Sequence, residues 1–337
     1  MKKVCLIVPY FGHLPNYFQL FLKSCAANTD FNWLIFTDDN TAYNYPDNVT
    51  RVLTSFTEIK KLFASKFDFK IALDSPYKFC DFKPTYGYVF EDYLKNYLFW
   101  GHCDIDTIMG KFSDFLTDDF LSQYDKIFAL GHMTLYRNTP ENNRVFMRPY
   151  KGKLLYKEYL SNPKICVFDE DCKNEYNVHN IFKAEGKRVF EGDYSLNFDI
   201  SKLQFRRVHY VGLFFCPLTH GHVTEEAKDA LYLWNRGEIC RYYMANDDVV
   251  KEAFLYIHLQ QRSMFVMPEV QKADVIRISP NVFSTMINRV DKAYLQKFSP
   301  WVSYSGLKRV IIAYLLANFK HRLGKIIRHI LKIEVSK

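Results

Sequence analysis

Residues 4–12 read VCLIVPYFG, a run of apolar side chains that ends in a turn-forming segment. Residues 15–27 then carry apolar side chains at helical spacing, at Phe18, Phe21, Leu22 and Cys25. A strand that is apolar on both faces, followed by a turn and a helix, is typical of a βα unit with a buried parallel strand. The sequence therefore predicts an α/β fold.

The same pattern recurs along the chain. Strands are predicted at residues 33–36, 49–53, 97–103 and 126–130, and helices at 57–67 and 86–94. This alternation favours a mostly parallel central sheet with helices on both faces and with ligands at the carboxyl ends of the strands. Later apolar runs at 208–215 and 254–259 are expected to return to the same sheet.

The charge is concentrated in one part of the chain. The formal net charge is +8, from 45 Lys and Arg against 37 Asp and Glu. Seven of the basic residues lie in residues 306–333, which contain no acidic residue, so the rest of the chain is nearly neutral. A nucleic-acid-binding protein with a broad basic face is therefore disfavoured, and no nucleic-acid partner is expected.

Residues 301–337 form a distinct C-terminal tail. Apolar side chains recur there at every third or fourth position, opposite the basic ones. The pattern predicts a cationic amphipathic helix, or two helices broken near Gly324, that associates with an anionic membrane surface. Docking onto a partner helix is the alternative.

The cysteines and the N-terminal segment indicate the compartment. Eight cysteines are scattered without any C-x-x-C pair, which is typical of reduced core thiols. The first apolar run stops at Pro9, which is too short for a signal-peptide core, and no stretch reaches the ~18 apolar residues of a spanning helix. We expect a cytoplasmic protein whose tail contacts the inner face of the cell membrane.

The most informative motif follows the predicted strand at 97–103. Asp104 and Asp106 lie two positions apart in an extended segment, so their carboxylates point to the same side. Mg²⁺ and Mn²⁺ accept a few carboxylate oxygens and complete their coordination with water and phosphate oxygens. The motif predicts a divalent cation that binds a nucleoside diphosphate. The alternative is that one Asp caps a following helix while the other is solvated.

Two other strand ends carry candidate nucleotide-binding residues, namely Pro9, Tyr10 and Phe11 after the first strand and Thr37, Asp38 and Asp39 after the second. The aromatic loop could flank a base, and the polar residues could bind a uracil edge or a ribose. For each loop taken alone, ordinary turn chemistry is the better explanation, and nucleotide binding is favoured because both loops are expected to reach one edge of the sheet. Neither a G-x-G-x-x-G nor a G-x-x-x-x-G-K-[ST] motif occurs, which disfavours a dinucleotide oxidoreductase and a P-loop kinase.

Lys83 precedes the predicted helix at 86–94. A cation at a helix start is unfavourable unless an anion lies nearby, so Lys83 is a candidate ligand of the diphosphate. A solvated loop lysine is the alternative.

Candidates for acid–base chemistry lie further along the chain. His132 follows the predicted strand at 126–130 and is expected to face the sugar or the acceptor. Asp169 and Glu170 lie in a polar loop and could supply a general base, as could Asp193. All three carboxylates could instead be solvated.

Five segments together resemble a family: residues 4–12, 36–39, 77–87, 99–106 and 256–262. They resemble a bacterial family of GT-A glycosyltransferases from capsule, exopolysaccharide and O-antigen gene clusters, over most of residues 1–285. The resemblance implies a GT-A-like, Rossmann-like sheet and a nucleotide-sugar donor whose diphosphate is bridged to a cation by Asp104 and Asp106. It also implies that His258 completes the metal shell. Arg262, four residues on, could neutralise the leaving diphosphate.

These observations give one main hypothesis. Residues 1–300 are expected to form a glycosyltransferase domain, with a nucleotide-binding half at about 1–140 and an acceptor half at about 141–300. With Mn²⁺ or Mg²⁺, the domain would transfer a sugar from a nucleoside diphosphate, most simply a UDP-sugar, to a glycan or lipid-linked oligosaccharide acceptor. The rivals are a nucleotidyl or phosphoryl transferase that uses the same two carboxylates, and a non-catalytic subunit of polysaccharide assembly.

Overall fold

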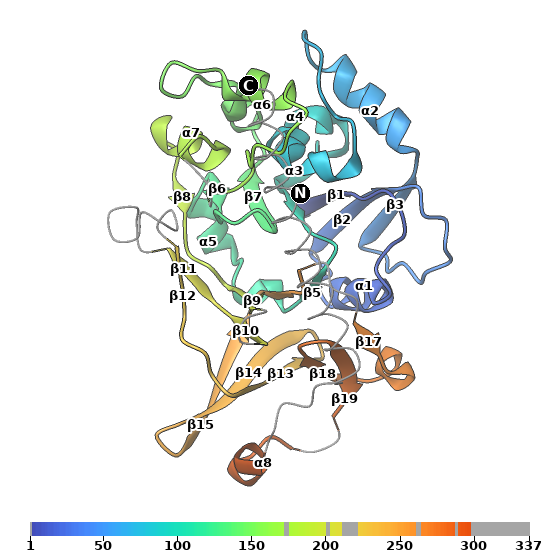
Figure 1. Cartoon of the computed structure of the whole chain (residues 1–337), viewed down its shortest axis with the longest axis vertical. Helices are drawn as coiled ribbons and strands as arrows, with labels where there is room; N and C mark the ends of the chain where they lie inside the picture. Colours follow the sequence, from blue (N-terminus) through green and yellow to red (C-terminus); the bar gives the residue numbers. More distant parts are fainter. Residues whose placement is uncertain are drawn as a thin grey trace, which may run out of the picture.

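The computed structural model describes residues 2–171, 175–199, 203–210, 222–260, 264–286 and 289–297. The tail at 301–337 and Arg262 lie outside these residues. Within them the chain forms a mixed α/β fold, which confirms the predicted class (Figure 1). No helix of the described part is long and apolar enough to cross a membrane.

The central sheet has seven strands among the described residues, in the order β3-β2-β1-β4-β7-β6-β8. Its strands are β1 (Lys2–Pro9), β2 (Phe31–Thr37), β3 (Val49–Leu53), β4 (Tyr97–Cys103), β6 (Lys126–Ile127), β7 (Met133–Arg137) and β8 (Val189–Phe190). The first four pair in parallel, whereas β7 runs antiparallel to β4 and to β6. The prediction of a strand at 126–130 was too long, because Phe128 takes a φ of 72° and ends β6 at Ile127.

The register of the sheet sets the position of the loops. Ile7 of β1 pairs with Leu34 of β2 on one side and with His102 of β4 on the other. The carboxyl ends of these three strands therefore reach the same edge of the sheet. The loops that carry the candidate residues after Val8, Phe36 and Cys103 meet there.

Helices cover both faces of this sheet. Figure 1 shows α2, α3, α4, α6 and α7 on one side and α1 and α5 on the other. Their bounds are α1 (Phe18–Ala26), α2 (Phe56–Ser65), α3 (Phe79–Phe82), α4 (Tyr86–Val89), α5 (Asp118–Gln123), α6 (Leu155–Leu160) and α7 (Val178–Ala184). Side chains of strand β4 contribute to the hydrophobic cores on both faces of the sheet. Phe99 packs into the core on the face covered by α1 and α5, and Trp100 packs into the core on the opposite face. Consecutive side chains along a strand point to opposite faces of the sheet. Because both faces are covered here, the sequence of β4 is a run of mostly apolar residues.

The predicted helix at 86–94 is replaced by shorter turns. Helix α4 ends at Val89, and Glu91–Tyr93 form a 3₁₀ turn before β4. At Gly87 a Cβ would lie 2.2 Å from the Trp100 ring, so only glycine allows α4 to approach the sheet this closely. The predicted helix at 57–67 is confirmed as α2, which begins one residue earlier, after the capping box of Ser55 and Glu58.

The C-terminal half adds sheets that the sequence did not predict. A six-stranded sheet contains β15 (Asp248–Phe254), β14 (Glu238–Ala245), β13 (Ala230–Asn235), β18 (Val275–Ser279), β19 (Val282–Thr285) and β17 (Phe265–Val266), and α8 (Lys292–Lys297) contacts it. It occupies the lower part of Figure 1. A two-stranded ribbon joins β11 (Val208–Tyr210) to β12 (His222–Thr224).

A four-stranded sheet links the two halves of the chain. Its order is β10 (Gln204–Arg206), β9 (Ser195–Asp199), β16 (Tyr256–His258) and β5 (Thr107–Met109). The expectation that residues 208–215 and 254–259 return to the central sheet was therefore wrong for their described parts. Strand β16 instead pairs with β5, directly after Asp104 and Asp106, because the chain turns away from the central sheet at that point.

Candidate functional site

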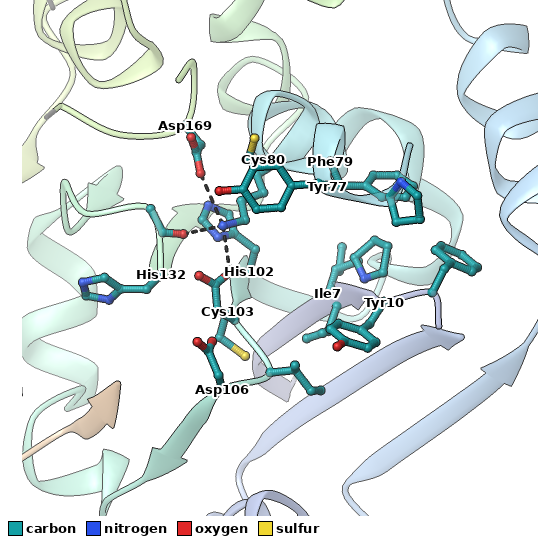
Figure 2. Close-up of a pocket in the computed structure, with 18 of the residues that line it drawn as sticks. Ile7, Tyr10, Tyr77, Phe79, Cys80, His102, Cys103, Asp106, His132 and Asp169 are labelled. Atoms are coloured by element: carbon teal, nitrogen blue, oxygen red, sulfur yellow. Dashed lines mark hydrogen bonds and ion pairs between the residues drawn. The ribbon is translucent and has the colours of Figure 1, made fainter. Parts of the chain in front are cut away.

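A cavity of about 720 Å³ lies at the carboxyl edge of the central sheet. Figure 2 shows Tyr77 and Phe79 on its helical side and Ile7 and Tyr10 on its strand side. The cavity is within the size range of small-molecule sites. Among the predicted residues it is lined by Pro9, Tyr10, Phe11, Lys83, Asp104, Asp106, His132, Asp169, Glu170 and His258.

Asp104, Asp106 and His258 form the centre of this site. One potential ligand atom from each lies within 4.8 Å of the others. Nε2 of His258 is 3.4 Å from Oδ2 of Asp106, which is 3% exposed. Two carboxylates and an imidazole are a donor set that suits Mn²⁺ or Mg²⁺. The residues present therefore fit the divalent cation that the sequence predicts.

The backbone holds the two acidic residues in place. The amide of Asp104 donates to the carbonyl of His132 at 2.9 Å, and the amide of Leu259 donates to the carbonyl of Asp106 at 2.8 Å. Strand β5 follows directly at Thr107, so neither carboxylate caps a helix. Pairing of β5 with β16 brings His258 beside them from the other half of the chain.

Lys83 lies between the acidic pair and a second acidic loop. Its Nζ is 2.8 Å from Oδ1 of Asp104, 2.7 Å from the carbonyl oxygen of Gly131 and 3.3 Å from Oδ2 of Asp169. The ion pair with Asp169 is drawn as a dashed line in Figure 2. Burial opposes the charge of Lys83, but the two carboxylates outweigh it and raise the pKa of Lys83 well above its usual value. Lys83 is therefore a fixed positive charge at the wall of the cavity.

Asp169 and Glu170 form the upper rim. Asp169 is 3% exposed, and burial raises its pKa to about 7. The amide of Gly131 donates to Oε2 of Glu170 at 2.9 Å. A Cβ at Gly131 would lie 2.7 Å from Oδ2 of Asp169, so a larger residue there would displace this carboxylate.

Sequence reasoning missed the buried ion pair that anchors this loop. Nζ of Lys78 lies 2.6 Å from Oδ2 of Asp81, and both side chains are at most 2% exposed. The two carboxylate oxygens of Asp81 accept the amides of Cys166 and Phe168, each at 2.9 Å. The anchored segment ends directly before Asp169. A Lys and an Asp three residues apart resemble a solvated helical pair in sequence, so no local signal marks them as buried.

His132 stacks against the proposed metal ligand. Its ring centroid lies 4.6 Å from that of His258, and its Nδ1 is 2.5 Å from the hydroxyl of Tyr256. Burial, followed by the nearby His258 and Lys83, lowers the pKa of His132 well below its usual value. His132 is therefore neutral, and its ring packs against the ring of His258.

The remaining predicted residues lie around the cavity rather than in its lining. Thr37 is fully buried at the end of β2. Asp38 accepts the amide of Gly12 at 2.7 Å, and Asp39 accepts the amide of Leu14 at 3.0 Å, so both brace the loop that carries Tyr10. Asp193 accepts the amides of Ser195 and Val208, away from the cavity lining.

Tyr77 and His102 are among the cavity residues that were not predicted. Tyr77 is 67% exposed at the mouth, opposite Tyr10 (Figure 2). His102 is 1% exposed, and neither of its ring nitrogens has a hydrogen-bond partner among the described residues. Both lie in segments that carry the family resemblance, residues 77–87 and 99–106. A tyrosine and a histidine at these positions gave no separate signal of a cavity.

The chain belongs to a family of unknown function, DUF6625, whose model matches residues 6–287. Solved structures with some similarity include the galactosyltransferase LgtC in complex with donor and acceptor sugar analogues (TM-score 0.33, 11% identity, 58% of this chain and 75% of that chain). An active-site mutant of LgtC is also similar (TM-score 0.32, 13% identity, 58% of this chain and 74% of that chain). No curated protein matches the chain. At this level of similarity, the function has to be argued from the side chains of the cavity.

Proposed function

We propose that the protein is a metal-dependent glycosyltransferase that uses a nucleoside diphosphate sugar, most simply a UDP-sugar. The observation that carries this proposal is the convergence of Asp104, Asp106 and His258 in one cavity, with Lys83 beside them. Two carboxylates at a strand end and a nearby fixed cation suit a ligand that contains a diphosphate and a divalent ion.

The shape of the cavity supports a nucleotide sugar. Rings of Tyr10 and Tyr77 stand on opposite walls and offer apolar faces to a base or a sugar. Phe11 stacks on Phe79 with centroids 5.9 Å apart, so it contributes to the wall rather than to an open face. Asp38 and Asp39 do not contact the nucleotide in this proposal. They hold in place the loop that carries Tyr10, which would contact it.

The reaction breaks the bond between the anomeric carbon and the diphosphate oxygen and forms a bond to an acceptor hydroxyl. When bound by Asp104, Asp106 and His258, a divalent cation supplies positive charge beside the leaving diphosphate, which takes the electron pair. Lys83 adds a positive charge at the same wall. The hydroxyl proton must move to a base, and Asp169 and Glu170 are the candidates at the rim. His132 supports the metal ligand rather than the proton transfer.

The acceptor is proposed from the sequence of the tail. Seven basic side chains in residues 306–333 would attract anionic lipids at ~1 kcal/mol each. A lipid-linked oligosaccharide of capsule, exopolysaccharide or O-antigen synthesis, at the cytoplasmic face of the membrane, fits such a protein. Co-sedimentation with anionic vesicles tests this: the full chain should pellet and residues 1–305 should stay in the supernatant. Equal sedimentation of both would contradict it.

The activity is tested with a panel of nucleotide sugars and Mn²⁺, with and without EDTA. We expect release of nucleoside diphosphate together with a transferred or hydrolysed sugar, and loss of both with EDTA. Cleavage between the phosphates would indicate a nucleotidyl or phosphoryl transferase instead. Binding without any release would indicate a non-catalytic assembly subunit.

A further inference from the structure

Asn197 lies beside His258 because β9 and β16 pair in parallel. His258 is the register partner of Asn197 on one side and of Thr107 on the other. Nδ1 of His258 is 3.0 Å from Oδ1 of Asn197, whereas Nε2 faces Asp106. The two ring nitrogens therefore face different groups, one a neutral amide and the other the proposed metal site.

The hydrogen bonds behind Asn197 have a fixed direction. Both carboxylate oxygens of Asp193 accept backbone amides, Oδ1 from Ser195 and Oδ2 from Val208. Asp193 is therefore an acceptor on both oxygens, and the hydroxyl of Ser195 donates to Oδ1 at 2.6 Å. The single hydroxyl hydrogen of Ser195 is used in this bond.

Because that hydrogen is used, Oγ of Ser195 acts as an acceptor toward Asn197. Nδ2 of Asn197 donates to it at 3.0 Å. This fixes the orientation of the amide and turns Oδ1 of Asn197 toward His258. An amide oxygen can only accept, so Nδ1 of His258 must carry the hydrogen.

We propose that Asn197 is a positioning residue that fixes His258 in the tautomer with the proton on Nδ1 and a free lone pair on Nε2. A metal-ligating imidazole needs such a lone pair, and the partner of its other nitrogen sets which one is free. Asp193 lies outside the cavity lining, but through its hydrogen bond with Ser195, and that of Ser195 with Asn197, it contributes to the orientation of His258. The inference rests on the proposed metal-dependent function for its consequence, but the tautomer itself belongs to the metal-free protein.

The experiment first measures the tautomer without metal. In ¹⁵N-labelled full-length protein at mildly alkaline pH, the ring signals of His258 are assigned by their loss in His258→Gln. We expect a protonated Nδ1 and an unprotonated Nε2. Asn197→Leu should abolish this preference, while Asn197→Asp, which keeps the acceptor, should retain it. A proton on Nε2 in the wild-type protein would overturn the inference.

The second measurement is Mn²⁺ binding by calorimetry. Replacing an outer partner of a metal ligand typically weakens binding about 10- to 100-fold, and we expect Asn197→Leu to fall in this range. The control is Asn32→Leu, a half-buried strand asparagine away from His258, which should bind as the wild type does. Thermal unfolding of Asn32→Leu and of Asn197→Leu shows whether both variants fold.

The outcomes separate the two proposals. If His258→Gln loses Mn²⁺ and Asn197→Leu does not, the positioning role is overturned and the proposed function stands. If the wild type binds no Mn²⁺, the proposed function is overturned, while the tautomer measured without metal still decides whether Asn197 orients His258. If Mn²⁺ binds and depends on Asn197 but no sugar is transferred, the positioning role stands and the proposed reaction is wrong.

Discussion

The ammonium group of Lys83 lies 2.8 Å from Oδ1 of Asp104, one of the two carboxylates that we propose as metal ligands. The same ammonium reaches Asp169 on the opposite rim, so a single lysine joins the two acidic groups of the cavity. Without this charge, the buried carboxylate of Asp169 and the partly exposed carboxylate of Asp104 would lie near each other without a cation between them. The stability of the cavity and its proposed chemistry thus depend on the same side chain.

Lys83→Met tests this dependence. Breaking a buried ion pair on one side costs about 3 kcal/mol, so the free energy of unfolding in urea should fall by about that amount. Lys60→Met is the matched control, because Lys60 makes an exposed pair with Asp74 at 2.8 Å and its loss should change stability little. Equal stability of the two variants would contradict the role of Lys83.

The acidic pair is tested by Asp104→Asn and Asp106→Asn. Each removes a proposed charged ligand, so Mn²⁺ affinity and Mn²⁺-dependent release of nucleoside diphosphate should fall by more than the roughly 100-fold expected for outer partners. Asp114→Asn, which replaces a partly exposed carboxylate paired with Lys111, is the control and should behave as the wild type. Wild-type Mn²⁺ affinity in either cavity variant would remove the residue from the metal site.

Asp169 should make stability depend on pH. Burial raises its pKa from 3.8 to about 7, so the folded chain keeps this proton where the unfolded chain has lost it. The resulting stabilisation is complete below pH 3.8 and is lost as the pH rises through about 7. Relative to wild type, Asp169→Asn should therefore gain stability between about pH 4 and about pH 8. Urea unfolding at both pH values measures this, and a constant difference would rule it out.

The buried pair of Lys78 and Asp81 should control the order of the acidic loop. Asp81→Asn removes the charge opposite Lys78 and should cost about 3–5 kcal/mol. Hydrogen exchange should accelerate at the amides of Cys166 and Phe168, which Asp81 accepts. Asp92→Asn is the matched control, since Asp92 pairs with Lys95 at the same spacing on the surface. Unchanged exchange in Asp81→Asn would show that the loop is anchored by other contacts.

The early strands and their loops could be predicted because the signal is local. The apolar run at 4–8 and the strand before Asp104 are each contiguous, and parallel pairing carries their loops to one edge. The distances between those loops and His258 could not be derived in this way. They depend on the pairing of β5 with β16, between segments that are far apart in the sequence and carry no mutual signal.

Two hairpins of the six-stranded sheet, β13–β14 and β14–β15, do carry a local sequence signal. Asn235 pairs with Glu238 and Ala245 with Asp248, so each hairpin turns in two residues. The turn residues Arg236, Gly237, Asn246 and Asp247 all have positive φ, as the type I′ turn of a two-residue hairpin requires. The letters NRGE and ANDD place Gly, Asn and Asp between two runs that contain apolar residues, which is a weaker form of the usual Asn-Gly hairpin signal.

The pairing of β5 with β16 also has a consequence for synthesis on the ribosome. The aspartates emerge early, but His258, the third proposed metal ligand, is added only after three strands of the six-stranded sheet, β13, β14 and β15, have been translated. A nascent chain halted before Tyr256 would expose an open edge of β5 and would be unable to retain a cation tightly. Under the proposed function, the nascent chain therefore completes its metal site only once Tyr256–His258 has been translated.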